Sequence, residues 1–176
     1  MVPLETVFIA WVIFFAIVGA LRGWAKELLV TFSVILARFI EFVIVVYVPV
    51  INVALQSLQQ TDPSTWFYIR LMIFTTLVAF GYATTVLSAR LSSRARKEKL
   101  QDTLLGLFLG GINGYLVIGM LWGFLHNLNY GIWGILGPQS PSAQNIVNYL
   151  PTDLFQGPSL FVAVAVSFAF VLIVFV

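Results

Sequence analysis

Apolar residues fill five stretches of the chain, each close to the length of a membrane-spanning helix. These stretches cover residues 4–21, 28–50, 66–87, 103–125 and 159–176. A helix needs about 20 mainly apolar residues to cross a hydrocarbon core of about 30 Å. The pattern therefore predicts an all-α polytopic membrane bundle of about five transmembrane helices, forming a single transmembrane domain.

The longest connection, residues 126–158, is punctuated by glycine and proline. Ser140 followed by Pro141 is typical of a helix cap and a first helical residue. We expect a short helix from there to Leu150, before Pro151. An ordered cover on the outer face of the bundle is one interpretation of this segment, and a substrate gate is the other.

Basic residues separate the connections into two kinds. Two connections carry seven cations, namely Arg22, Lys26, Arg90, Arg94, Arg96, Lys97 and Lys99, whereas 51–65 and 126–158 contain no Lys or Arg. The positive-inside rule then predicts an amino terminus outside and a carboxyl terminus inside. Cations follow the first stretch instead of preceding it, which indicates a retained span and not a signal peptide. The apolar ending VLIVFV indicates either an end buried among partners or further chain beyond Val176.

Composition supports the membrane class and limits the chemistry. Hydrophobic residues make up 60% of the chain and charged residues only 9%, too few charges for a soluble surface. The net charge of +2 is too small to indicate nucleic-acid binding. One histidine and no cysteine exclude a multi-histidine or thiolate metal site, and no nucleophile–base pattern is present. We therefore expect no enzymatic activity and no tightly held cofactor.

The connection between the first two stretches reads VGALRGWAKELL. Gly19 and Gly23 weaken the helix there. Arg22 lies at a helix carboxyl end, where a cation is favourable, and Glu27 lies in the first turn of the next helix, where an anion is favourable. This pattern predicts a tight, charged hairpin on the cytoplasmic side, next to Trp24 as an interfacial anchor. These residues could be explained by membrane topology and helix capping alone, without any further function.

The fourth stretch combines a candidate cap with glycines at four-residue steps. Asp102 is a candidate N-cap for this helix. The glycines are Gly106, Gly110, Gly114, Gly119 and Gly123. Small residues at this spacing allow close helix packing in lipid, so the helix is expected at the bundle centre or at a seam with a second copy or another membrane protein. Asn113 lies near the same stripe, and we expect it to bond to a neighbouring helix.

Together these two stretches resemble the colicin V production protein (CvpA) family. The resemblance covers the first four stretches and is carried by Arg22, Gly23, Trp24, Glu27, Asp102, Gly106, Gly110 and Gly114. It implies a small protein of the bacterial inner membrane, associated with peptide-toxin production or export and with envelope homeostasis. It assigns no enzyme activity or cofactor. The long outer connection and the fifth stretch are additions to the four-span plan of this family.

Three charged residues interrupt the apolar stretches. Arg38 and Glu41 share one helix face, and Arg70 comes to within about one turn of Glu41 in depth. An intramembrane charge costs about 2.5–3.5 kcal/mol on insertion scales, which favours pairing. We predict an interhelical cluster in which Glu41 bridges both arginines. It could fix helix register, contact a partner subunit or belong to a transport or proton path.

His126 directly follows the fourth stretch and has polar neighbours in the sequence. It is interpreted as an interfacial polar residue, or as a ligand for a haem or chlorophyll tetrapyrrole. From the sequence, our first hypothesis is a non-enzymatic scaffold or accessory protein in the lipid bilayer. One form of it is a subunit of a larger respiratory or photosynthetic membrane complex. The alternative is a small transporter or channel component.

Overall fold

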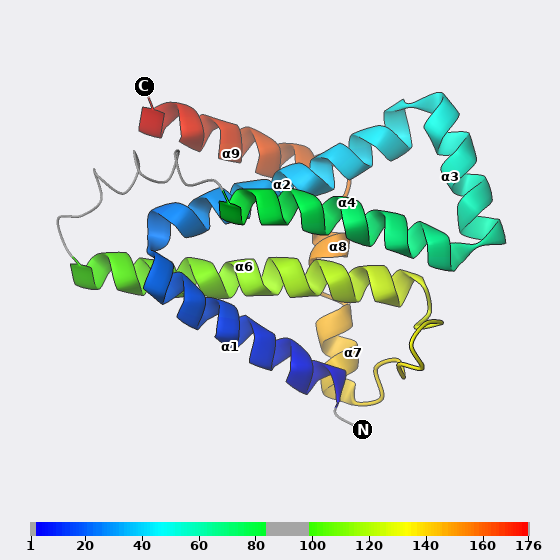
Figure 1. The fold of residues 1–176 in the computed structure, drawn as a ribbon, viewed down its shortest axis with the longest axis horizontal. Coiled ribbons are helices and arrows are strands. Elements are labelled where there is room, and N and C mark those ends of the chain that lie inside the picture. The colour runs from blue at the N-terminus through cyan, green and yellow to red at the C-terminus, as the bar shows by residue number, and fades with distance from the viewer. Residues whose placement is uncertain (1–2, 84–98, 176) are drawn as a thin grey trace.

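The computed structural model describes residues 3–83 and 99–175, and every regular element in these ranges is a helix (Figure 1). The end of the third apolar stretch and the cations Arg90, Arg94, Arg96 and Lys97 lie outside the described residues. The helices are α1 (Leu4–Arg22), α2 (Trp24–Tyr47), α3 (Pro49–Thr61), α4 (Pro63–Ala83), α6 (Lys99–Asn127), α7 (Pro141–Val147), α8 (Pro151–Leu154) and α9 (Pro158–Phe175).

Four of these helices, α1, α2, α4 and α6, are long and apolar enough to cross a membrane. A fifth candidate is a bent pair of segments, Pro141–Leu154 and Pro158–Ile173, which pass the same test only together and meet at a bend of 63°, as in a broken span or a re-entrant loop. The predicted all-α class and the count of about five are therefore confirmed as four to five candidate spans.

Helix α6 lies at the centre of the bundle. It packs against α1 along most of its length and also contacts α2, α4 and α8 (Figure 1). The main core is built from buried side chains of α2, α4 and α6, among them Val34, Phe74 and Phe124. The structure thus places the glycine-rich helix at the centre, the first of the two positions expected for it.

The connection expected at residues 51–65 is mostly helical. Helix α2 ends at Tyr47, and α3 begins at Pro49 after an extended residue, Val48. Proline disrupts a helix that precedes it but suits the first helical position. Pro49 therefore ends the helix of the second apolar stretch and begins α3. No residue of α3 is buried.

The segment after α6 holds two short helices, α7 and α8. As predicted, Ser140 caps a short helix, accepting a hydrogen bond from the Ala143 N–H at 3.0 Å. That helix, α7, ends at Val147, and α8 then packs against the side of α6. The contact lies at Gly119 and Gly123 of α6, about 12 and 6 Å before the helix end. This part of the segment therefore lies beside α6, and α7 contacts α1.

Candidate functional site

Gly23 makes the turn between α1 and α2 as the only residue between them. Its φ of 86° lies in the left-handed region that favours glycine. A Cβ at this position would also lie 2.7 Å from the Asp102 carboxylate. Both the backbone angle and the approach of Asp102 therefore require glycine in this turn.

Asp102 does not cap its own helix, because α6 already begins at Lys99. Its Oδ1 instead accepts a hydrogen bond from the backbone N–H of Trp24 at 3.0 Å. Trp24 is the first residue of α2, so Asp102 caps α2 from another helix. Asp102 is therefore a cap, as predicted, but for α2 and not for α6. The first N–H groups of α2 need an acceptor and carry partial positive charge, which a carboxylate satisfies.

Asp102→Ala is expected to lower the free energy of unfolding by about 1 kcal/mol, the usual cost of a lost cap. Asp102→Asn keeps an acceptor oxygen and is expected to retain most of that stability. Unfolding of both variants in mixed micelles checks this. Equal losses for the two variants would show that the Trp24 bond is not what Asp102 contributes.

Glu27 is the centre of a buried polar group at the same end of the bundle. Its side chain is 0% exposed and pairs with Arg22 at 3.2 Å. Asn113 donates from Nδ2 to the Glu27 backbone oxygen at 2.8 Å and to Oε2 at 2.9 Å. We call Arg22, Glu27, Thr31, Tyr82 and Asn113 the Glu27 cluster; they come from α1, α2, α4 and α6.

The remaining contacts of the Glu27 cluster involve two residues that sequence reasoning missed. Thr31 donates to Asn113 Oδ1 at 2.7 Å. Tyr82 has its ring 4.3 Å from the Arg22 guanidinium carbon, and Arg22 donates to the Tyr82 backbone oxygen at 3.4 Å. Thr31 could have been found from its four-residue spacing to Glu27, whereas nothing in the sequence around Tyr82 indicates its role.

The glycines of α6 lie against two different neighbours. Gly106 and Gly110 lie against Gly19 of α1, and Gly114 lies against Val12 and Phe15 of the same helix. Gly119 and Gly123 instead lie against Pro151 and Thr152 of α8. All five glycines are buried within this chain, so their face of α6 is already filled.

Glu41 lies between Arg38 and Arg70, in the arrangement predicted for the membrane interior. Arg38 donates to Oε2 at 2.9 Å, and Arg70 Nε donates to Oε1 at 2.5 Å. Each of the three side chains is at most 12% exposed. We call these three residues the Glu41 cluster. It carries one carboxylate and two guanidinium groups, a net charge of +1.

An apolar layer separates the two clusters. Glu27 and Glu41 are fourteen residues apart on α2, about 21 Å along its axis. Between them, Val30, Val34 and Ala37 are at most 1% exposed and pack with Met120 and Phe74 of α6 and α4. Ser33 also lies between the clusters on α2, but its hydroxyl donates to the Leu29 backbone oxygen at 2.9 Å, within the same helix.

His126 lies in a small polar network at the end of α6. Its Nδ1 is 3.1 Å from the Tyr130 hydroxyl, which also accepts a hydrogen bond from Trp122 Nε1 at 3.0 Å. Burial raises the pKa of Tyr130, so its hydroxyl stays protonated and can donate to His126. Among the described residues, no group of three potential metal ligands occurs. These contacts fit the interfacial interpretation of His126.

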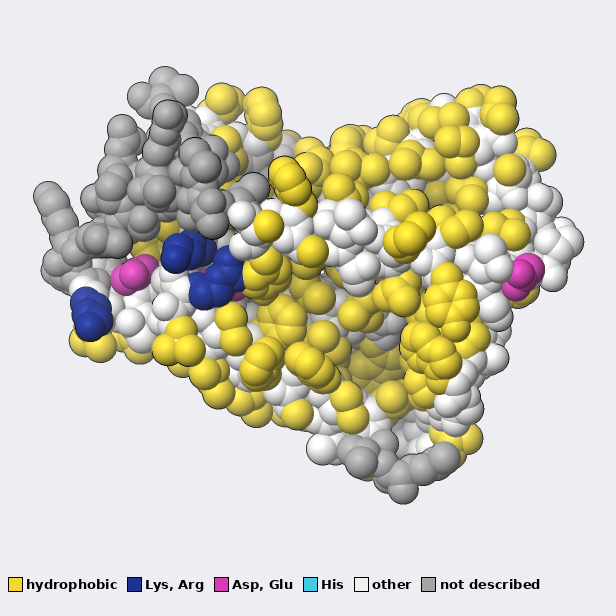
Figure 2. Space-filling model, viewed as in Figure 1, with side chains coloured by type: hydrophobic (Ala, Val, Ile, Leu, Met, Phe, Trp, Pro, Cys, Tyr) yellow, Lys and Arg dark blue, Asp and Glu magenta, His cyan; other side chains and the backbone are white. Residues whose placement is uncertain are grey.

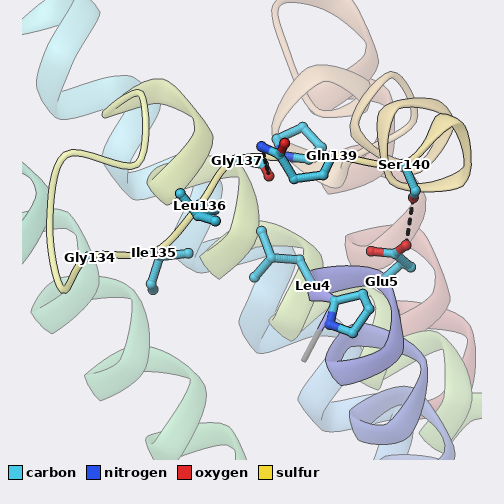
Figure 3. Close-up of a pocket in the computed structure, with 10 residues that line it drawn as sticks. Leu4, Glu5, Gly134, Ile135, Leu136, Gly137, Gln139 and Ser140 are labelled. Carbon is cyan, nitrogen blue, oxygen red and sulfur yellow. Dashed lines mark hydrogen bonds between the residues drawn. The ribbon is translucent and has the colours of Figure 1, made fainter. Parts of the chain in front are cut away.

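A cavity of about 500 Å³ lies between the start of α1 and the segment before α7 (Figure 3). Leu4, Ile135 and Leu136 supply apolar walls, and Glu5 is the carboxylate at its edge. Ser140 donates to Glu5 Oε1 at 2.5 Å, which ties α1 to the α7 cap. These walls suit an apolar group, and the Glu5 carboxylate could accept a hydrogen bond from a polar part of the same molecule.

The family model described as "Colicin V production protein" matches residues 4–149. The matched region runs from α1 to the end of α7 and contains both polar clusters and the five glycines of α6. No curated protein and no solved structure matches the chain.

Proposed function

Because the chain belongs to the colicin V production protein family, we propose that it is a non-enzymatic scaffold or accessory protein of the bacterial cytoplasmic membrane. The chain is a multi-pass membrane protein of this family, with helices that contact the lipid bilayer. The context that we propose for it is the one associated with the family, production or export of a peptide toxin and envelope homeostasis.

For the orientation we propose an amino terminus outside and a carboxyl terminus inside. The described connection cations Arg22, Lys26 and Lys99 support it, since they lie where α1 meets α2 and where α6 begins. Figure 2 shows Lys and Arg side chains gathered at this end, with apolar side chains over most of the remaining face. Basic residues beside spans favour the cytoplasmic side.

The apolar layer between the Glu27 and Glu41 clusters carries the proposal of a scaffold. Intramembrane ionisable residues often mark ion or proton paths. Here Glu27 binds Arg22 and Asn113, and Glu41 binds Arg38 and Arg70, so both carboxylates join neighbouring helices. The buried side chains of α2 between the clusters, Val30, Val34 and Ala37, are apolar and belong to the main core. Such an arrangement favours assembly of the bundle over conduction through it.

The alternative function is a small transporter or channel component. The observation in its favour is the burial of two carboxylates inside candidate spans, Glu27 and Glu41. A transport cycle would have to open the layer that contains Val34 and Met120, both 0% exposed. We therefore rank this function second.

Partner proteins would contact a surface other than the glycine face of α6. Large apolar side chains are exposed on α1 and α9, among them Trp11, Phe14, Phe168 and Ile173. Lipid covers such a surface in an isolated bundle, and membrane-protein partners cover it in an assembly. A subunit of a larger respiratory or photosynthetic complex is one form of this proposal.

Mild solubilisation from native membranes, followed by affinity purification through a tag, tests the scaffold role. We expect other membrane proteins to co-purify at fixed stoichiometry and to stay bound through size-exclusion chromatography. Absorption spectra of the same fractions would identify a respiratory or photosynthetic assembly by its tetrapyrrole bands. Recovery of the chain alone, at native expression levels and in several mild detergents, would contradict the proposal.

A further inference from the structure

A second cavity is lined by residues of α3, α4 and α6. The turn from α3 to α4 lies at the end of the bundle away from the turn between α1 and α2 (Figure 1). The volume of the cavity is about 190 Å³. The polar side chains that line it are Gln59 from α3, Arg70 from α4 and Asn127 from α6. Trp66, Phe67 and Phe124 supply aromatic walls. One largely buried guanidinium residue and two exposed amide residues thus border the same space.

Arg70 is held firmly beside this cavity. Its Nε is bonded to Glu41, and its guanidinium carbon lies 4.2 Å from the Phe124 ring centroid and 5.6 Å from that of Trp66. The two Nη groups of Arg70 have no hydrogen-bond partner among residues 3–83 and 99–175. A guanidinium group binds carboxylates and phosphates through paired donors, so these free groups suit an anion.

The net positive charge of the Glu41 cluster also favours an anionic ligand. The Glu41 cluster has a net charge of +1 in a site where its three side chains are at most 12% exposed. No carboxylate lines the cavity in the described part of the chain. Asp62, next to the lining residue Pro63, is already bonded to the Thr65 N–H at 3.2 Å and to the Thr65 hydroxyl. An anion would complete the charge balance of this cluster.

We propose that this cavity binds one anionic group, a carboxylate or a phosphate, through the Nη groups of Arg70 and the amides of Gln59 and Asn127. The volume accommodates a group of that size and excludes a large solute. Arg70 lies about 10 Å along α4 from its start at Pro63, so both a free anion and the phosphate of a lipid headgroup can reach it. The site is independent of the scaffold role.

Two binding measurements separate the two sources of the anion. The purified protein, in a neutral detergent and a low-chloride buffer, is titrated calorimetrically with inorganic phosphate and with acetate. In parallel, native mass spectrometry counts phosphatidylglycerol molecules retained by the protein. Saturable binding of phosphate or acetate identifies a free anion, and retention of one phosphatidylglycerol without that binding identifies a lipid phosphate. Wild-type protein that binds none of these probes would overturn the proposal.

Variants place the binding at this cavity. Arg70→Gln is expected to abolish it, and Gln59→Leu and Asn127→Leu are each expected to weaken it roughly tenfold, the effect of one lost hydrogen bond to a charged group. Lys26→Gln removes one cation at the opposite end and is expected to leave binding unchanged. Neither amide side chain makes a hydrogen bond within the described residues, so their variants test the site even if Arg70→Gln does not fold. Unchanged binding in both amide variants would contradict the assignment.

Discussion

Gly110→Ala is expected to separate α1 from α6 and to leave little folded protein. A Cβ at position 110 would lie 2.4 Å from the Phe15 backbone oxygen and 2.9 Å from the Gly19 Cα. Both are backbone atoms, so no side-chain rotation relieves the clash. Overpacking of a well-packed core costs about 1–3 kcal/mol or more, and between helices in lipid close contact is itself the main source of stability. We expect a loss of about 3 kcal/mol or more in the free energy of unfolding, measured in mixed micelles.

Gly111→Ala is the matched control on the same helix. The nearest atom to a Cβ at position 111 is the Ala16 Cβ at 3.7 Å, an ordinary contact. Alanine is favoured over glycine in a helix by about 1 kcal/mol, so this variant is expected to be as stable as the wild type or more stable. Equal destabilisation by the two substitutions would contradict the close packing of α1 on α6 described above.

Glu41→Gln is expected to have the second large effect. It removes the one negative charge between Arg38 and Arg70 and leaves two cations together inside the bundle. Removing one partner of a buried ion pair costs about 3–5 kcal/mol. We expect a loss of that order, seen as unfolding at a lower denaturant fraction and as a smaller yield of monodisperse protein.

Arg38→Gln tests whether the Glu41 cluster contributes to stability through its charge balance or through side-chain packing. It leaves Glu41 paired with Arg70, a neutral pair, and removes a guanidinium whose buried Nε has no partner in the described structure. A much smaller loss than for Glu41→Gln is expected, since no uncompensated charge is created. A loss as large as that of Glu41→Gln would mean that Arg38 acts through packing instead of charge.

Two kinds of feature could be predicted from the sequence: those that depend on residue spacing within one helix, and those that depend on the thickness of the bilayer. The apolar stretches predict the spans because helix rise and bilayer thickness are fixed. Arg38, Glu41 and Arg70 could be grouped because three-residue spacing and equal depth bring charges together. A short connection also makes the two helices neighbours, and the contacts in the structure agree with all three constraints.

Features that depend on the meeting of distant elements could not be predicted in the same way. Asp102 has the composition of a cap, but its partner Trp24 is set by how α1, α2 and α6 converge around Gly23. Tyr82 reaches Arg22 only because α4 ends beside that turn. The break at Val48 had a signal in Pro49, but the apolar residues on both sides concealed it.

Proton flux in proteoliposomes tests most directly whether the buried ionisable groups hold helices together or line a path. Vesicles that contain the purified chain would carry a potassium gradient, with valinomycin setting the membrane potential and a trapped dye reporting internal pH. The packed layer at Val30, Val34 and Met120 predicts a flux equal to that of protein-free vesicles. Flux above that level, abolished by Glu41→Gln in vesicles with an equal amount of folded protein, would contradict the scaffold account.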